Sequence, residues 1–418
     1  PTIPYFYVVK YSHHIYCLCW DTSPQREADI CEGNIMVISK PVVRPANPRF
    51  SSGPCSKPPA WDLGALGQEA LGRSHRSIVG KSKLKKAIDK TKQILKIPES
   101  YLVGIVPASN TGAFEMAMWN LLGQRHVEML AWENFGNTWA SDTVNQLKID
   151  ATIKKADYGE IVDFSSVDFN NDVCFTWNGT TSGVMVGEKE IIPKNRDGLT
   201  LCDATSAAFS MNLPWDLLDA TTFSWQKSLG GEGAHGVIVL SPRAVKRLET
   251  YKPSWPLPKI FRLTKENNLI NGIFSGETIN TPSMLCVEDY LFSLKWADSI
   301  GGLDSLIGRT KKNAAAVTQY VNNTPWLSFL AKDPGVRSIT SVCLEVNDPR
   351  IKDPKAFIKS VVKRLENEKV AFDVGSHRDA PPGLRIWCGP TVEVSDIKAL
   401  MPWILWAFTT EIISQGNL

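Results

Sequence analysis

A lysine in the sequence Ser-Trp-Gln-Lys-Ser-Leu-Gly-Gly, residues 224–231, has surroundings that suit amine chemistry. Lys227 ends an apolar run and stands ahead of a glycine-rich turn. Partly apolar surroundings disfavour the charged form of a lysine, lower its pKa and free the amine for Schiff-base chemistry. A single lysine is more often a surface charge, so this interpretation depends on its neighbours.

The first such neighbour is Asp203, which ends the preceding apolar run, residues 199–202. The carboxyl ends of strands line the ligand crevice of open α/β sheets, so a carboxylate there can meet a buried cation or a ring nitrogen. For this residue alone, an aspartate that caps the following helix is the alternative. The spacing from Asp203 to Lys227, on successive strand ends, favours a shared site.

Residues 107–113, Pro-Ala-Ser-Asn-Thr-Gly-Ala, follow an apolar run and open a helix. Backbone N–H groups and the positive end of the helix dipole would face an anion there. An ordinary helix capped by Ser109, Asn110 or Thr111 explains the turn equally well.

Trp139 stands near the start of a helical stretch one element later. It is either a packing aromatic, among 14 tryptophans, or a ring that stacks on a ligand.

Residues 231–236, Gly-Glu-Gly-Ala-His-Gly, match the pattern GxGxxG. A dinucleotide-binding fingerprint follows a strand and opens a helix. This match instead precedes the strand-like run 237–240, Val-Ile-Val-Leu. We therefore reject a dinucleotide site.

The elements that must position these residues alternate between helical and strand-like patterns. A helix is expected at 81–97 and a closing helix at the C-terminal end. Short apolar runs alternate with helical patterns up to about residue 300, which predicts an α/β domain with a largely parallel sheet. A compact α+β unit follows. The strand-like runs are 102–107, 173–177, 199–203, 221–225 and 237–240, and the later elements are a helix at 306–321, a strand at 342–346, a helix at 354–368 and a strand at 384–388.

This organisation predicts three segments. Residues 1–45 show little amphipathic period and are interpreted as an N-terminal extension, either outside the native protein or a flexible arm. Residues 46–300 form a large domain that starts with a Pro/Gly-rich loop, and residues 301–418 form a small C-terminal domain.

Composition excludes several classes of protein. The 418 residues are 43% hydrophobic and 21% charged, and no run approaches the roughly 18 apolar residues of a membrane span. The 46 basic and 43 acidic residues are too balanced for a nucleic-acid binder. Nine cysteines, none in a CxxC pair, predict a reducing, cytoplasmic compartment without a disulfide framework. No metal site is expected, even at the cluster of His13, His14, Cys17, Cys19 and Cys31.

Four stretches together resemble one family. They are residues 47–54 (Asn-Pro-Arg-Phe-Ser-Ser-Gly-Pro), 74–77 (Ser-His-Arg-Ser), 224–233 around Lys227, and 378–386 (Arg-Asp-Ala-Pro-Pro-Gly-Leu-Arg-Ile). Over about residues 44–415 the chain resembles the phosphoserine aminotransferases, class V enzymes that depend on pyridoxal 5′-phosphate (PLP), in their archaeal and proteobacterial branch. The resemblance implies a fold-type I α/β transferase: a large domain with a mostly parallel seven-stranded sheet and a smaller α+β C-terminal domain.

The resemblance also implies an activity. The enzyme would transfer the amino group between L-glutamate and 3-phosphohydroxypyruvate, giving O-phospho-L-serine and 2-oxoglutarate in serine biosynthesis. A homodimer would share its active sites. The related 4-phosphohydroxy-threonine of pyridoxine biosynthesis stays open as a second substrate.

The family's cofactor residues carry over to matching positions. Lys227 would bind PLP covalently as a Schiff base, Asp203 would pair with the protonated pyridine nitrogen, and Trp139 would stack on the ring. The remaining cofactor contacts would be Thr180 at the phenolic oxygen, and Asn110, Thr111 and Gln226, with Asn280 and Thr281 of the partner subunit, at the phosphate. The chain departs from the other branch of the family at Asn110 and Thr111, where many members have an arginine.

Substrate recognition would fall to cationic side chains. Arg385 would bind the α-carboxylate, because the planar guanidinium holds a carboxylate through two hydrogen bonds. A substrate with two anionic groups needs further cations. The distal phosphate or side-chain carboxylate would be held by His75, Arg76, His377 and Arg378.

Three rivals remain within the same fold. A cysteine desulfurase would stack a histidine on the ring, where this chain has Trp139. A serine–glyoxylate or alanine-type aminotransferase would not need two His-Arg pairs. A catalytically silent protein would not need Lys227, Asp203 and Arg385 together.

Overall fold

The computed structural model describes residues 7–11, 14–18, 39–189 and 191–415. Most of the 1–45 extension, including His13, Cys19 and Cys31 of the cluster named above, lies outside the described residues. Strands β1 (Tyr7–Tyr11) and β2 (His14–Leu18) pair as an antiparallel hairpin. Within the described ranges, no helix is both long and apolar enough to cross a lipid bilayer.

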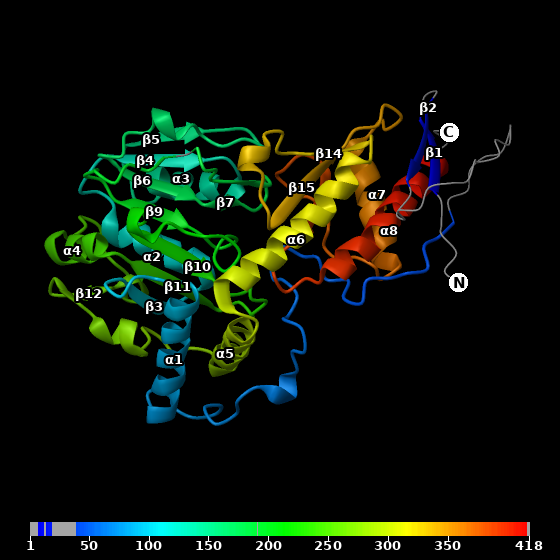
Figure 1. Cartoon of the computed structure of the whole chain (residues 1–418). Helices are drawn as coiled ribbons and strands as arrows, with labels where there is room; N and C mark the ends of the chain where they lie inside the picture. The colour runs from blue at the N-terminus through cyan, green and yellow to red at the C-terminus, as the bar shows by residue number, and fades with distance from the viewer. Residues whose placement is uncertain (1–6, 12–13, 19–38, 190, 416–418) are drawn as a thin grey trace.

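The large unit, on the left in Figure 1, is built on a seven-stranded sheet with the order β3-β11-β10-β9-β6-β4-β5. Only β11 runs antiparallel to its neighbours, so the expected α/β architecture with a mostly parallel seven-stranded sheet is confirmed. The strands are β3 (Leu102–Pro107), β4 (Val127–Ala131), β5 (Ala151–Lys155), β6 (Asp172–Thr176), β9 (Thr200–Asp203), β10 (Ala220–Ser224) and β11 (His235–Leu240).

Helices cover both faces of this sheet. They are α1 (Ile78–Ile94), α2 (Ser109–Leu121), α3 (Asn134–Asn145), α4 (Pro242–Thr250) and α5 (Met284–Ser299). Helix α1 begins three residues before the predicted start because the Ser77 side chain accepts from the Gly80 N–H and caps it. It ends before the predicted 97 because Lys96 takes a left-handed φ of 54°. Two short hairpins, β7 (Asn178–Gly179) with β8 (Val184–Met185) and β12 (Thr264–Lys265) with β13 (Asn268–Leu269), complete the large unit.

The small unit packs helices against a three-stranded antiparallel sheet, β14 (Leu327–Phe329), β15 (Ser341–Val346) and β16 (Gly383–Trp387). Its helices are α7 (Pro354–Asn367), α8 (Val394–Ser414) and the second half of α6 (Gly302–Asn322). Helix α6, yellow in Figure 1, spans both units. Leu306 near its start lies in the core of the large unit, and Val317 near its end lies in the core of the small unit.

The Pro/Gly-rich N-terminal loop runs between the two units. Arg49 forms a parallel bridge with Phe372, and the Phe50 carbonyl accepts from the backbone N–H of Trp387 on β16 at 3.1 Å. Phe50 is fully buried in the core of the small unit. A few residues later, the Cys55 N–H donates to the Gln226 carbonyl at 2.9 Å. The loop therefore connects the small sheet with the segment that carries Lys227.

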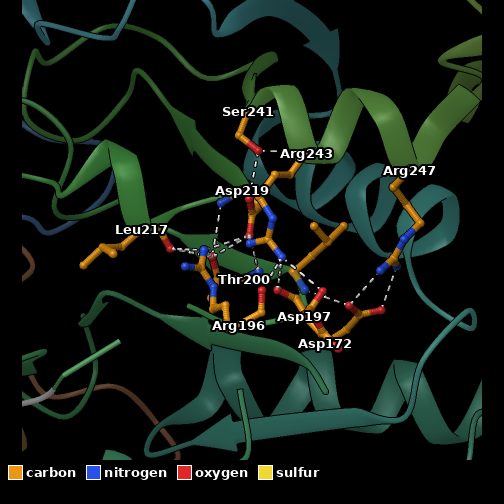
Figure 2. Close-up of polar contacts among 12 residues, drawn as sticks. Asp172, Arg196, Asp197, Thr200, Leu217, Asp219, Ser241, Arg243 and Arg247 are labelled. Carbon is orange, nitrogen blue, oxygen red and sulfur yellow. Dashed lines mark hydrogen bonds and ion pairs between the residues drawn. The ribbon is translucent and has the colours of Figure 1, made fainter. Parts of the chain in front are cut away.

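Ion pairs to buried aspartates fix the amino ends of the parallel strands (Figure 2). Arg247 on α4 contacts Asp172 at the start of β6 at 2.8 Å, and both side chains are buried. Arg196 and Arg243 both contact Asp219 just before β10, at 2.9 and 3.0 Å. These contacts hold the strands at one edge of the sheet. The opposite edge, where the parallel strands end, carries the candidate site.

Candidate active site

Asp203 and Trp139 meet at the centre of the crevice. Asp203 is the last residue of β9 and is 6% exposed. One of its carboxylate oxygens accepts from Trp139 Nε1 at 3.2 Å, and the other accepts from the Thr205 N–H at 3.0 Å. Burial raises the pKa of Asp203, and these hydrogen bonds together with the nearby Lys227 partly offset that rise. The buried carboxylate can therefore accept a further hydrogen bond from a cationic donor.

Lys227 follows β10 and is half-buried beneath the N-terminal loop. Its amine donates a hydrogen bond to the Ser52 carbonyl oxygen. Burial lowers the pKa of Lys227, and the Arg385 cation lowers it further, against the opposing effects of Cys55 and Asp203. The buried position of the amine favours its neutral, nucleophilic form.

The N-terminus of α2 is open at the same edge of the sheet. The residue before the helix, Ala108, takes a left-handed φ of 66°, and no side chain caps the helix. The Asn110 side chain is 7% exposed, and its Oδ1 has no hydrogen-bond partner among the described residues. Of the two interpretations of this turn, ordinary capping by a serine, asparagine or threonine side chain is therefore not what the structure contains. An uncapped N-terminus suits an anion.

Thr180 lies in the turn between β7 and β8. This turn forms hydrogen bonds to both the large and the small unit. Its hydroxyl donates to Ser206 Oγ at 2.7 Å, and its carbonyl accepts from Ser341 Oγ of β15 at 2.6 Å. Gln226 lies beside Lys227, and its side-chain oxygen accepts from the Ser224 hydroxyl. Thr180 is thus held near the segment that follows Asp203, and Gln226 lies next to Lys227 in the chain.

Of the substrate residues predicted in the small unit, Arg385 lies close enough for its charge to act on Lys227. Arg385 on β16 has a buried Nε without a hydrogen-bond partner among the described residues, and its charge acts on Lys227. His377 lies close enough for burial first, and then the Arg385 cation, to lower its pKa. Arg378 is 86% exposed beside Asp379. The side chain of Arg385 is thus the best placed of these to meet a carboxylate.

Four predicted residues have no hydrogen bond or ion pair to the Lys227 crevice among the described residues. His75 is 8% exposed with a partnerless Nε2, and Arg76, Asn280 and Thr281 are exposed.

Sequence reasoning missed two parts of the site. One is the backbone of Ser52 and Gly53, which lies against the Lys227 amine. The other is Glu133, a 1% exposed carboxylate two residues after β4. A strand-terminal acid was the signal that identified Asp203, but the strand at 127–131 was not predicted, so the same signal at Glu133 was missed.

The comparisons with known proteins agree with the motifs. No family profile matches the chain. A phosphoserine aminotransferase of Methanosarcina barkeri is 57% identical over 370 residues, which cover 88% of this chain and 99% of that protein. The chain belongs to the phosphoserine aminotransferase family.

Solved structures agree on the fold. The crystal structure of a phosphoserine aminotransferase from Cytophaga hutchinsonii superimposes with a TM-score of 0.74 at 22% identity, covering 86% of this chain and 99% of that one. An alanine–glyoxylate aminotransferase from Nostoc reaches 0.70 at 16% identity, with 89% of this chain and 97% of that one covered. Members of the phosphoserine aminotransferase family thus share this fold with enzymes named for other substrates, so the fold alone does not choose the substrate.

Proposed function

We propose that the chain is a PLP-dependent phosphoserine aminotransferase that moves the amino group between L-glutamate and 3-phosphohydroxypyruvate, forming O-phospho-L-serine and 2-oxoglutarate. The identity of 57% along 99% of the Methanosarcina barkeri phosphoserine aminotransferase carries the proposal. The cationic groups around Arg385 support substrates with two anionic ends. A glyoxylate or alanine-type enzyme would leave those groups without a role.

The side chains present fit PLP. The uncapped N-terminus of α2, with the partnerless Oδ1 of Asn110, suits the phosphate. The buried Asp203 carboxylate suits a protonated ring nitrogen, because a cationic donor offsets the burial that raises its pKa. The indole of Trp139 would lie on the ring, and the Lys227 amine would hold the cofactor covalently.

When bound, PLP withdraws electrons from the bond between the amino acid's Cα and its hydrogen. Lys227 Nζ would hold the cofactor covalently and, once free, would act as the base that takes the proton from Cα. Burial favours the neutral amine that this step requires. Asp203 would keep the ring nitrogen protonated, and Arg385 would orient the substrate by holding its α-carboxylate.

The resemblance to the family supports a site shared by two copies of the chain. Among the described residues, no hydrogen bond or ion pair joins His75, Arg76, Asn280 or Thr281 to the Lys227 crevice, and the resemblance assigns Asn280 and Thr281 to the partner subunit. We propose that a homodimer completes each site, with Asn280 and Thr281 contributed by the other subunit. His377 and Arg378 would then hold the distal anion together with His75 and Arg76.

The experiment is an amino-transfer assay of the purified, PLP-loaded protein with glutamate as donor. Offered separately, 3-phosphohydroxypyruvate should be converted, whereas pyruvate and glyoxylate should be converted at least ~100-fold less efficiently, because the distal cations discriminate by several kcal/mol. Lys227→Ala should abolish turnover. Comparable use of glyoxylate would overturn the substrate assignment, and turnover by Lys227→Ala would remove the lysine from its role.

A further inference from the structure

Glu133 is a buried acid at the start of α3, and its two oxygens serve two different elements. Oε1 accepts from the backbone N–H groups of Phe135 at 2.9 Å and Gly136 at 3.1 Å, which caps the helix. Oε2 accepts from the Thr181 hydroxyl at 2.7 Å and from the Thr181 N–H at 3.4 Å. The side chain therefore links the first turn of α3 to the turn between β7 and β8.

Helix capping alone does not explain this residue. Serine, threonine, aspartate and asparagine are the preferred N-caps, and their short side chains suffice for the two N–H groups. Burying a carboxylate carries a desolvation penalty, which the extra bonds to Thr181 offset. The neighbouring backbone also leaves room for the longer side chain, because a Cβ on Gly179 would lie 3.1 Å from Glu133 Cγ and 2.9 Å from Trp132. The reach to Thr181 is thus the distinguishing feature of Glu133.

The two elements that Glu133 joins carry the groups assigned to two parts of the cofactor. Helix α3 presents Trp139, whose indole reaches Asp203, and the turn presents Thr180, next in sequence to Thr181. We propose that Glu133 is a positioning residue. It fixes the position of the stacking Trp139 relative to Thr180, and thereby the position of the cofactor ring. The proposal rests on the assignment of PLP to this crevice.

The carboxylate of Glu133 also interacts electrostatically with ionisable groups of the crevice. Burial raises the pKa of Glu133 to about 7, and Asp203 adds to the rise while the bonds from Thr181 and Gly136 oppose it. The ionisable groups that sense its charge are Asp203, Lys227, Tyr158 and Cys343. A change at Glu133 should therefore also be visible in the spectrum of a bound cofactor.

Two substitutions cut the link from opposite sides. Glu133→Asp keeps the charge and can still cap α3, but its side chain is one methylene group shorter and does not extend to Thr181. Thr181→Val removes the hydroxyl while keeping the shape of the side chain. We expect each variant to bind PLP about tenfold more weakly and to change the visible circular dichroism of the bound cofactor. The double variant should be no worse than either single one, since both remove the same contact.

The control is Asp353→Ala, which removes the side-chain cap of α7 in the small unit. It should lower the stability of the cofactor-free protein without altering the PLP spectrum or affinity. Wild-type PLP affinity and dichroism in both Glu133→Asp and Thr181→Val would overturn the proposal and leave Glu133 as a cap. If Glu133→Asp fails to fold, Thr181→Val decides alone. None of these readouts uses a substrate, so a wrong substrate assignment would appear separately, in the transfer assay.

Discussion

The Lys227 amine donates a hydrogen bond to the Ser52 carbonyl oxygen, across 175 residues of sequence. This contact joins the end of β10 to a loop that is itself bound to the small unit through Phe50. The loop excludes water from the amine on one side, which contributes to the burial that lowers its pKa. The position of the lysine therefore depends on the backbone of this loop as well as on its own strand.

Gly53→Ala should displace the lysine and also strain the loop, because Gly53 takes a φ of 155°, a backbone conformation that other residues rarely adopt. A Cβ at position 53 would lie 2.5 Å from Lys227 Nζ, the flexible end of a side chain that can move away. Since misplacing a reacting group by about 1 Å can cost roughly a hundredfold in rate, we expect kcat to fall by about that factor. Gly233→Ala is the control for the added methyl group alone, because nothing lies within 4 Å of its Cβ. Equal kcat values for the two variants would show that the loop does not hold the amine.

Arg385→Lys should weaken both substrates alike. Glutamate and 3-phosphohydroxypyruvate share the α-carboxylate, and a lysine cannot reproduce the paired hydrogen bonds of a guanidinium. We expect kcat/KM to fall roughly 10- to 100-fold for each substrate, with PLP affinity unchanged. Arg125→Lys, at an exposed ion pair with Asp197, should have no effect. A loss confined to the phosphorylated substrate would instead assign Arg385 to the distal anion.

Arg247→Met should destabilise the large unit. It leaves the fully buried Asp172 without its cationic partner, and breaking a buried pair from one side costs about 3–5 kcal/mol. Arg243→Met is the comparison, because its side chain is 39% exposed and Asp219 keeps Arg196 (Figure 2). Urea denaturation of the cofactor-free protein should show a much lower midpoint for the first variant than for the second. Similar midpoints would contradict the role given to the buried pair.

His235 should make the fold sensitive to acid. The imidazole is 4% exposed, and its Nε2 accepts from the Ser283 N–H at 3.1 Å, which requires an unprotonated nitrogen. Burial lowers the pKa of His235 from 6.5 to about 4. The unfolded chain then binds a proton more readily than the folded one, so stability is retained above pH 6.5 and lost as the pH falls toward 4.

Urea midpoints at pH 7.5 and pH 4.5 measure this effect. The decrease between the two pH values should be smaller in His235→Leu than in the wild type, whatever the stability of the variant at pH 7.5. An equal decrease in both proteins would assign the acid sensitivity to other groups.

Much of the large unit was predictable because its strands are short apolar runs between turn residues. The strands that end near Asp203 and Lys227 were found within one or two residues. Strands β4 and β5 were missed. Strand β5 has no fully buried residue and carries two lysines, and β4 contains Glu128, which pairs with Lys154 of β5, so neither strand forms a long apolar run.

From the sequence alone, the site was predictable only at strand ends that carry a chemically functional side chain, such as Asp203 and Lys227. Contacts between distant segments, such as Glu133 with Thr181 or Lys227 with Ser52, depend on the topology of the sheet and leave no local pattern. The resemblance supplied residues such as Thr180, for which neither spacing nor residue type gives a signal. It also assigned His75 to the site and Asn280 to the site of the partner subunit, roles for which the sequence around them gives no signal.

The half-reaction of the PLP-loaded enzyme tests the central claim most directly. With one amino acid added at a time and no acceptor present, the visible absorbance of the bound cofactor should disappear with O-phospho-L-serine and with L-glutamate. It should persist with serine and alanine, which lack a second anionic group for the cations around Arg385. Loss of the absorbance with serine or alanine, and none with O-phospho-L-serine, would contradict the assignment.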